Sequence, residues 1–404
     1  MKTEHKKLIY LLAGLNVLNF ADRYILSAVA PSIQRDLGFT DGQLGMIGTA
    51  FLWGFVLASP FVSNLLRRFS PQVVLAFAVF IWSAATAATG VVRLLFTMVA
   101  LRAIIGVGQV IFSTISPPLI DSLTVKSWKA RAMSMYYAAV PVGVAIGFIA
   151  GGLMDMVIGW QMGFILAGAL GIPIALAIHR MPKIKIPKSA SMEQVKKSLN
   201  ELFAHPKYIL TVAGNVFLEF ALAGFAFWAP VYFSRQLNYP SAEGSILFGT
   251  IFFATGVVGT FLGGWLVDNF IKSQNRIALM KLLFVLLVPA AMMGFVAIAA
   301  NSVLGFFISM AVVQILLFSC FTPFALAFFQ VIPPGMKEKA NSANLFISRL
   351  LGDMLGIWLV GALSTALGSL SLAIYILPFM LLVSALIWWF SYHVPDFVPS
   401  KARV

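Results

Sequence analysis

The feature that most constrains the fold of this chain is a series of apolar runs, each long enough to cross a lipid bilayer. A transmembrane helix needs about 20 mostly apolar residues. Runs of this length cover twelve segments, at residues 8–31, 43–66, 72–95, 97–120, 131–154, 160–179, 208–233, 244–268, 276–299, 302–331, 341–365 and 370–391. They are continuous and do not alternate with polar residues, which excludes a transmembrane β-barrel. The sequence therefore predicts an all-α polytopic membrane protein with twelve transmembrane helices.

The composition excludes a soluble enzyme. The 404 residues are 60% hydrophobic and 10% charged, whereas soluble domains carry about 25% charged residues. The single cysteine, Cys320, lies inside an apolar run, so we expect no disulfide framework and no cysteine-based metal site. The sequence has no nucleophile motif, metal-binding motif or phosphate-binding loop. We therefore expect no enzyme activity, no catalytic residues, no metal and no cofactor.

The apolar runs divide into two sets of six, because all connections are short except the one between the sixth and seventh runs. This predicts an N-terminal six-helix lobe over residues 1–179, a basic cytoplasmic linker over 180–207 and a C-terminal six-helix lobe over 208–404. The linker segment from Ser191 to Ala204 is expected to form a short amphipathic helix on the membrane surface. Such a layout is typical of a duplicated two-lobe transporter.

The formal net charge of +14 is carried mainly by segments between the runs. Most lysine and arginine residues lie on the side of the membrane that holds the N-terminus, and only Arg35, Arg93 and Arg235 lie on the other side. Cytoplasmic segments of membrane proteins are enriched in these residues. Both termini and the linker are therefore expected in the cytoplasm, and the high charge requires no nucleic-acid partner.

Charged residues inside the apolar runs are the first candidates for a functional site, because an ionisable side chain near the bilayer centre is costly. Asp22 is interpreted either as a proton carrier or as a fixed counter-ion for an arginine. Arg349 and Asp353, four residues apart, either neutralise each other or line a cavity. Glu219 has no basic neighbour in its own run, so it is either protonated at rest, partnered across helices, or active in coupling or substrate binding.

Polar residues in the first run form a stripe. The spacing of Asn16, Asn19 and Arg23 puts these side chains on one helical face, with Asp22 beside them. A polar stripe on an apolar helix must face the interior of the bundle or a wet cavity. In the fourth run, Gln109 follows Arg102 by two helical turns on the same face.

Several motifs resemble those of Spinster-type transporters in the major facilitator superfamily. The stretch Asn19-Phe-Ala-Asp22-Arg23-Tyr24 resembles the N-Y-x-D-R signature of that family. The resemblance continues through Gly45–Phe51, Phe80–Ser83, Arg102–Gln109, Ser113–Pro117, Tyr136–Gly152 and Leu350–Gly361. It covers most of the chain and suggests a bacterial Spinster-like homologue.

The resemblance implies a proton-coupling pair. The family has an aspartate in its first helix and an arginine in its fourth that are thought to respond together to protonation, and here these positions are Asp22 and Arg102. The family also has a glutamate seven residues after that arginine, where this chain has Gln109. This departure removes one titratable group, and Glu219 is a candidate for the displaced site.

The resemblance also bears on the substrate, since Spinster-type proteins are associated with sphingolipids and lysophospholipids. An anionic head site is expected around the arginines of the runs, with an apolar wall formed by aromatic residues. The expected lining of the cavity comprises Asn19, Arg23, Gln109, Arg349, Asp353 and Trp228.

A cytoplasmic latch is expected in the C-terminal half only. The superfamily has a Gly-x-x-x-Asp-Arg pattern after the second helix, but here the aspartate is replaced by Arg67. The equivalent stretch after the eighth run keeps Gly264 and Asp268, with Arg276 downstream. We therefore expect Asp268 and Arg276 to form the latch.

The expected function is a proton-coupled secondary transporter of an amphiphilic or lipid-like anion, working by alternating access. A proton symporter for a small organic acid or sugar acid is the alternative within the same fold. A transporter-like receptor without flux, and least of all an integral-membrane enzyme, are the alternatives from other classes. We expect a monomer in a bacterial inner membrane, with protons and a small lipid-like molecule as its partners.

Overall fold

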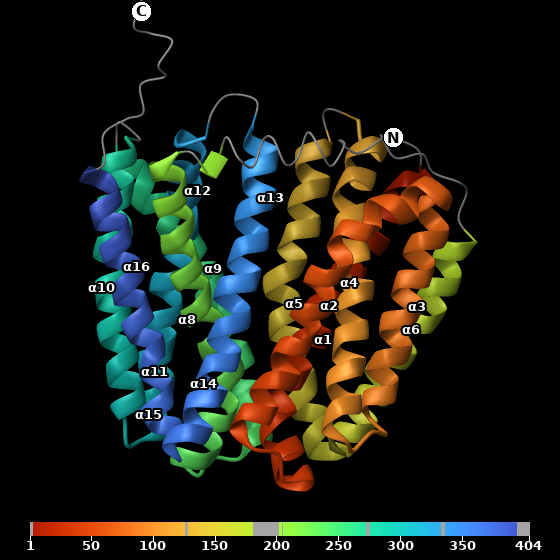
Figure 1. Cartoon of the computed structure of the whole chain (residues 1–404), viewed down its shortest axis with the longest axis horizontal. Coiled ribbons are helices and arrows are strands. Elements are labelled where there is room, and N and C mark those ends of the chain that lie inside the picture. The colour runs from red at the N-terminus through yellow and green to blue at the C-terminus, as the bar shows by residue number, and fades with distance from the viewer. Residues whose placement is uncertain are drawn as a thin grey trace, which may run out of the picture. The chain divides into compact units, whose positions relative to one another are not determined.

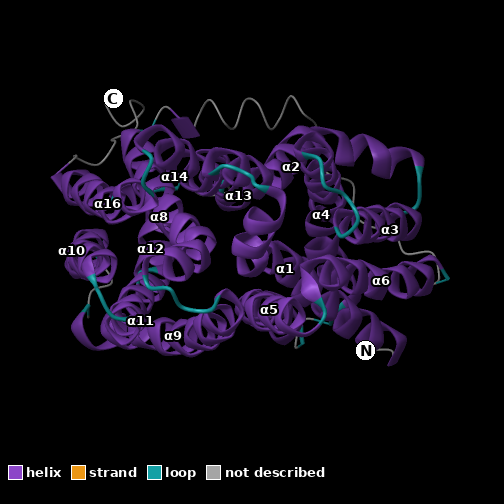
Figure 2. Cartoon of the chain, turned by 90° about the horizontal axis from the view of Figure 1, so that it is seen from below, coloured by secondary structure: helices purple, strands orange, loops and turns teal. Residues whose placement is uncertain are grey.

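The computed structural model describes residues 3–125, 128–180, 202–203, 205–271, 275–332 and 336–393. Throughout this part of the chain the regular structure is helical, and no strand is formed (Figure 2). The predicted all-α fold class is confirmed. The predicted amphipathic helix of the linker lies almost entirely outside the described residues.

The first six predicted runs each become one helix. These are α1 (Thr3–Leu37), α2 (Asp41–Arg68), α3 (Pro71–Thr89), α4 (Leu95–Leu123), α5 (Lys129–Val157) and α6 (Gly159–His179). The helix α3 ends earlier than the predicted run 72–95. Gly90 closes its last turn by donating its N–H to the carbonyls of Ala87 and Ala88, and Arg93 lies in the following loop.

Three of the last six runs are interrupted. The helices are α8 (Pro206–Gln236), α9 (Ser241–Phe270), α10 (Arg276–Ala299), α11 (Val303–Ser319), α12 (Phe321–Gln330), α13 (Lys337–Ile347), the π-helix η1 (Ser348–Asp353), α14 (Met354–Leu367), α15 (Leu370–Ile374) and α16 (Ile376–His393). The break between α11 and α12 lies at Cys320, just before Pro323. A proline inside a helix clashes with the carbonyl four residues earlier, here that of Ser319, so the helix is interrupted at this point.

Within the described residues, eleven helical segments are long and apolar enough to cross a membrane. They correspond to the predicted runs after the first. The remaining predicted run, the first, is α1, which has 35 residues but is more polar than the others. Its polar residues Asn16, Asn19 and Asp22 are buried in the protein, so α1 can span the bilayer without exposing them to lipid.

The chain forms two compact units. Unit 1 comprises Met1–Ser189, Ala226–Phe253 and Ile357–Ala373, and unit 2 comprises the remainder. In unit 1, α1 packs on α5, α2 on α4, and α3 on α6 and α4; in unit 2, α10 packs on α11, α12 and α16 (Figure 1). The predicted lobes, over residues 1–179 and 208–404, divide the sequence into two halves, and this division stays a prediction.

The crossing of α2 and α4 depends on two glycines. A Cβ atom on Gly54 would lie 1.8 Å from the carbonyl oxygen of Ala103, and one on Gly106 would lie 1.8 Å from that of Phe51. Neither position has room for a side chain. The two helices therefore approach with backbone against backbone, as small residues permit in membrane proteins.

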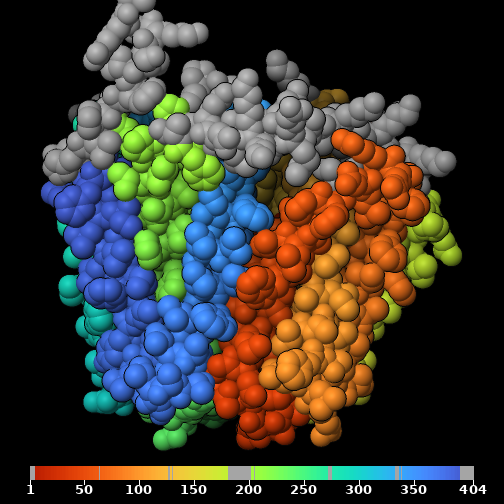
Figure 3. All heavy atoms as spheres, in the orientation of Figure 1, coloured from red at the N-terminus to blue at the C-terminus, as the bar shows by residue number. Residues whose placement is uncertain are grey.

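The outer face of α2 carries large apolar side chains. Trp53, Leu57 and Phe61, spaced by four residues, are at least half exposed, and α2 lies at the surface in the space-filling view (Figure 3). A stripe of this size suits contact with lipid chains. By contrast, Phe51 on the same helix is buried and faces the interior of unit 1.

Candidate functional site

The polar stripe predicted on α1 is buried inside unit 1. Small residues of α5 allow this, because Gly143 and Gly147 lie directly against the carbonyl oxygens of Val17 and Ala21 on α1. The side chain of Asn16 donates to the carbonyl of Tyr136 on α5, at 2.9 Å. These contacts fix the rotation of α1, so the stripe points toward α3 and α4.

The carboxylate of Asp22 is held by two neutral donors from two other helices. The hydroxyl of Thr86 on α3 donates to Oδ1 at 2.9 Å, and the amide of Gln109 on α4 donates to Oδ2 at 3.2 Å. Asp22 is almost completely buried. The charge of Arg102 acts on it more strongly than that of Arg23.

Gln109 joins the two charged residues of the α1 signature. Its side-chain oxygen accepts a hydrogen bond of 2.8 Å from Nε of Arg23, while its nitrogen donates to Asp22. Gln109 is fully buried. Gln109 is therefore placed between the acid and the base.

Arg102 lies in the interior of unit 1 with its charge only partly satisfied. The residue is 1% exposed, and within the described part of the chain its Nε and Nη1 atoms have no hydrogen-bond partner. Among the described residues, Asp22 and Arg102 do not form an ion pair. A buried guanidinium without hydrogen-bonded acceptors is costly, so this position favours an anionic group.

The guanidinium of Arg23 is surrounded by aromatic rings. Its central carbon lies 4.9 Å from the ring centres of Phe20 and Phe51 and 6.0 Å from that of Phe55. Nη2 of Arg23 also donates to the side chain of Asn19, at 3.4 Å. A cation set among ring faces is stabilised by their quadrupoles, and the surroundings combine positive charge with apolar surface.

The predicted polar residues of unit 2 also come together. Arg349 and Asp353 form an ion pair across the π-helix η1, so they do neutralise each other within one helical segment. Glu219 on α8 lies beside them, because a Cβ atom on Gly352 would be 3.0 Å from Cβ of Glu219, and both charges act on it. This cluster holds two carboxyl groups and one guanidinium.

The π-helix has a polar neighbour on α8. Nδ2 of Asn215 donates to the hydroxyl of Ser348 at 2.8 Å and lies 3.5 Å from the side-chain oxygen of Asn344. Short π-helical segments often occur at functional sites. Neither the π-helix nor this contact was expected from the sequence.

Trp228, expected in the wall of a cavity, is fully buried in unit 1. Its indole N–H donates to the carbonyl of Ile357 at 2.9 Å, and its ring lies against Gly361. In this conformation Trp228 therefore packs one end of unit 1 and presents no free aromatic surface.

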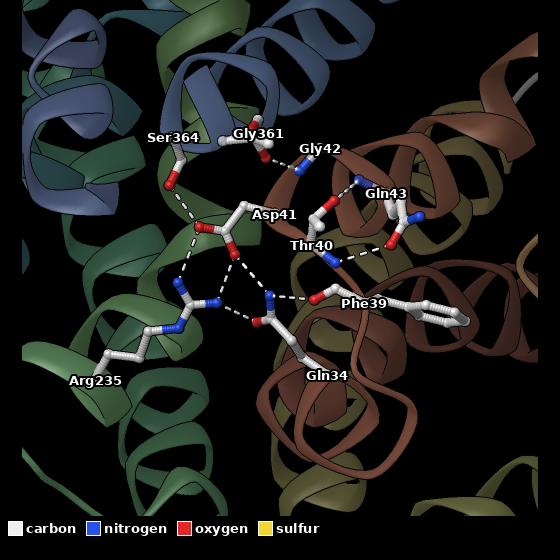
Figure 4. Close-up of polar contacts among 10 residues, drawn as sticks. Gln34, Phe39, Thr40, Asp41, Gly42, Gln43, Arg235, Gly361 and Ser364 are labelled. Carbon is white, nitrogen blue, oxygen red and sulfur yellow. Dashed lines mark hydrogen bonds and ion pairs between the residues drawn. The ribbon is translucent and has the colours of Figure 1, made fainter. Parts of the chain in front are cut away.

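The same end of unit 1 holds a polar cluster that sequence reasoning missed. We call Gln34, Asp41, Arg235 and Ser364 the Asp41 cluster, and Figure 4 shows three of them converging on the carboxylate of the fourth. Arg235 donates to Asp41 at 2.9 and 2.5 Å, Gln34 donates at 2.7 Å, and Ser364 donates at 2.5 Å. The cluster joins α1 and α2 to the ends of α8 and α14.

Local sequence places Asp41 at the start of α2. Thr40 is the N-cap and forms a capping box with Gln43, and this Thr-x-x-Gln pattern was a readable signal for a helix start. Gly42 donates its backbone N–H to Thr365 at 2.8 Å. The other signal for this cluster in the sequence was Arg235, which is one of the few basic residues predicted on the side of the membrane opposite the N-terminus.

The residues of the predicted cytoplasmic latch are not in contact in this conformation. Asp268 is exposed at the end of α9. Arg276 is largely buried, and its Nη2 atom donates to the carbonyl of Ser391 at 2.6 Å. Among the described residues, no three histidine, cysteine or carboxylate side chains are grouped so that they could hold a metal ion.

Comparisons with known proteins agree with this architecture. The family model described as Major Facilitator Superfamily matches residues 12–356. The sphingosine-1-phosphate transporter SPNS2 of Xenopus tropicalis is 27% identical over 369 residues, which cover 86% of this chain and 72% of the relative. Protein spinster homolog 1 of Bos taurus is 26% identical over 393 residues, covering 91% of this chain and 74% of the relative.

A solved structure has the same fold. A bacterial homologue of the human lysosomal transporter Spinster, in an inward-facing and occupied conformation, matches with a TM-score of 0.84. The match covers 97% of this chain and 98% of that chain at 18% sequence identity. At this identity the likeness concerns the fold.

Proposed function

This chain belongs to the Major Facilitator Superfamily as a Spinster-type transporter, and from that premise we propose that it carries an amphiphilic anion across the membrane in exchange with, or together with, protons. The observation that carries the proposal is the buried guanidinium of Arg102, whose Nε and Nη1 have no hydrogen-bond partner among the described residues. Such a group is stabilised by an anion, which either Asp22 or a substrate can supply.

Protonation of Asp22 supplies the coupling step. When ionised, its carboxylate attracts Arg102 through a medium of low dielectric constant, where the attraction is much stronger than in water. When protonated, it loses this attraction, and Arg102 is released for the substrate anion. Proton binding and substrate binding thus bias the same helices between two conformations.

The surroundings of Arg23 support an amphiphilic substrate. A phosphate or carboxylate can pair with the guanidinium, while Phe20, Phe51 and Phe55 offer apolar contacts at the same place. The names of the relatives, which include sphingosine-1-phosphate and sphingolipid transporters, support a lipid-like substrate for this chain.

Alternating access requires that each end of the transport pathway closes in turn. The Asp41 cluster is suited to close one end, because it ties α1 and α2 to residues that follow in the second half of the sequence. Asp268 and Arg276 would form the latch at the other end when the Asp41 cluster opens. Glu219, with Asp353 and Arg349, would provide a second proton site.

The chain is a multi-pass membrane protein. We place both termini in the cytoplasm, because the basic segments lie on the side of the N-terminus. We also propose that the protein is a monomer in a bacterial inner membrane. The Asp41 cluster then lies on the periplasmic side.

A proton symporter for a small organic acid or sugar acid is the second candidate. The contact between Arg23 and Asn19 favours it, since paired arginine and asparagine side chains can bind a small polar acid. The two candidates differ in the chain length of the substrate, so one panel of compounds separates them.

The experiment measures proton flux into proteoliposomes that contain a pH-sensitive dye. The panel comprises sphingosine-1-phosphate and lysophospholipids on one side, and small organic and sugar acids on the other. Flux triggered by an amphiphile and abolished by Asp22→Asn is the expected result, with Asp121→Asn, an exposed aspartate paired with Lys129, as the control. Uptake without a proton signal would contradict the coupling, and flux with small acids alone would favour the symporter.

A further inference from the structure

Gln109 makes, without carrying a charge, a set of contacts that an ionised carboxylate cannot make together. Its oxygen accepts from Nε of Arg23 at 2.8 Å, and its nitrogen donates to Oδ2 of Asp22 at 3.2 Å and to the carbonyl of Asn19 at 3.5 Å. A carboxylate accepts hydrogen bonds but does not donate them. An ionised glutamate at this position could therefore accept from Arg23 but could not donate to Asp22, and only a protonated glutamate could do both.

The orientation of this amide follows from its partners. If oxygen and nitrogen were exchanged, the NH₂ group would face the guanidinium and the oxygen would face the carboxylate. Both contacts would then be repulsive. Because Gln109 is fully buried, water does not compete for either partner.

Among the described residues, the charged groups that act on Asp22 and the nearest tyrosine can be named by helix. Arg23 is its neighbour on α1, Arg102 acts on it from α4, and the hydroxyl of Tyr136 belongs to α5, where the charge of Arg23 acts on it. Thr86 on α3 is neutral. Gln109 hydrogen-bonds to both Asp22 and Arg23 and so links the two side chains.

We propose that Gln109 is a positioning residue that separates the proton carrier from the anion-binding guanidinium. It holds Arg23 in place through a neutral oxygen, so the position of Arg23 does not depend on whether Asp22 carries a proton. This inference rests on the proposed function of Asp22 and Arg23. It also means that, among the described residues, Asp22 has no second carboxyl group at the position of Gln109, whereas two neighbouring carboxyl groups would titrate as a coupled pair.

The first test is an infrared titration of the purified full-length protein. The signal of Asp22 is obtained as the difference between each variant and the same variant carrying Asp22→Asn. A single step is expected for the wild type and two coupled steps for Gln109→Glu. The matched control is Gln314→Glu, because Gln314 is also a buried glutamine of a membrane helix but bonds to Thr255 in unit 2; one step is expected there.

The second test measures the binding of lysophosphatidylglycerol, whose phosphodiester keeps one negative charge, at a pH below and a pH above the Asp22 step. The wild-type affinity should change little. Gln109→Leu frees Arg23 to approach ionised Asp22, so its affinity should fall about tenfold at the higher pH, equivalent to about 1.4 kcal/mol.

Two results would overturn the inference: a single step in Gln109→Glu, or a wild-type affinity that falls across the Asp22 step as steeply as that of Gln109→Leu. The proposed function fails separately, if the wild type neither binds the lipid nor moves protons. In that case the infrared titration still decides the role of Gln109.

Discussion

The guanidinium of Arg235 donates two hydrogen bonds, of 2.9 and 2.5 Å, to the carboxylate of Asp41. Asp41 is the first residue of α2, and Arg235 lies in the last turn of α8. Charge-assisted pairs of this two-point kind are stronger than ordinary hydrogen bonds. In the proposed transport cycle, the pair therefore stabilises the conformation in which this end of unit 1 is closed.

Replacing Arg235 by alanine should open this end. Hydrogen bonds to charged groups contribute about 1.5–3 kcal/mol. Because the side chain of Arg235 is 36% exposed, we expect a loss near the lower end, about 1.4 kcal/mol, which corresponds to a tenfold larger open population. The reporter is a cysteine at Ser245, a buried residue that donates to Ala28, in a Cys320→Ser background. Its reaction with a membrane-impermeant maleimide should become about tenfold faster. Arg35→Ala, which removes a more exposed arginine nearby, should leave the rate unchanged; equal rates in both variants would refute the role of the pair.

Replacing Arg102 by methionine should stabilise the protein and abolish transport. The variant removes a buried charge whose hydrogen bonds are incomplete. Replacing buried charged groups by apolar residues is often stabilising by about 1–4 kcal/mol when no charge is left without its partner, and Asp22 can take up a proton in this variant while Thr86 and Gln109 still contact it. Thermal unfolding in detergent should therefore show a higher Tm. Arg93→Met, in an exposed loop, is the control with no expected change. A lower Tm for Arg102→Met would mean that the guanidinium contributes to the folded state.

Gly54→Ala and Gly264→Ala should have opposite effects on stability. A Cβ atom at Gly54 would collide with the carbonyl of Ala103, whereas nothing lies within 4 Å at Gly264. Overpacking costs about 1–3 kcal/mol, while alanine in an open helix position is favoured over glycine by about 1 kcal/mol. Tm should therefore fall in the first variant and stay equal or rise in the second. A tolerated alanine at position 54 would contradict the close crossing of α2 and α4.

The ion pair of Arg349 and Asp353 should behave as a unit. Arg349→Gln or Asp353→Asn alone leaves one charge without its partner in a low-dielectric setting, which we expect to cost about 1–2 kcal/mol because Arg349 is partly exposed. The double variant should recover most of the lost stability. A double-mutant cycle on the free energy of unfolding measures this coupling, and strictly additive losses would argue against the pair.

The helices and the buried stripe were predictable from sequence because each depends on local spacing. Continuous apolar runs marked the membrane helices, and the spacing of Asn19 and Arg23 marked the inward face of α1. The resemblance to Spinster-type transporters then directed attention to Asp22, Arg102 and Gln109. Their roles in coupling stay predictions.

The Asp41 cluster was not predictable by the same reasoning. Asp41 and Ser364 lie at the ends of helices. Polar and charged side chains have a low free-energy cost there because water is near, so their sequence surroundings did not identify them as candidates for a functional site. They are also separated by 323 residues in the chain. Likewise, the π-helix at Ser348–Asp353 has no signature in a pattern of 3.6 residues per turn. Both features arise from packing between distant segments.

The glutamine at position 109 has a consequence for how such carriers can diversify. Glutamine and glutamate codons differ by one base, so a single nucleotide change adds or removes a carboxyl group beside Asp22. With Gln109 in place, the neighbourhood of Asp22 is one point mutation away from an arrangement with two acids. In the proposed coupling through Asp22, the number of titrating carboxyl groups can therefore be changed by selection in a single step, with no alteration of the helices around it.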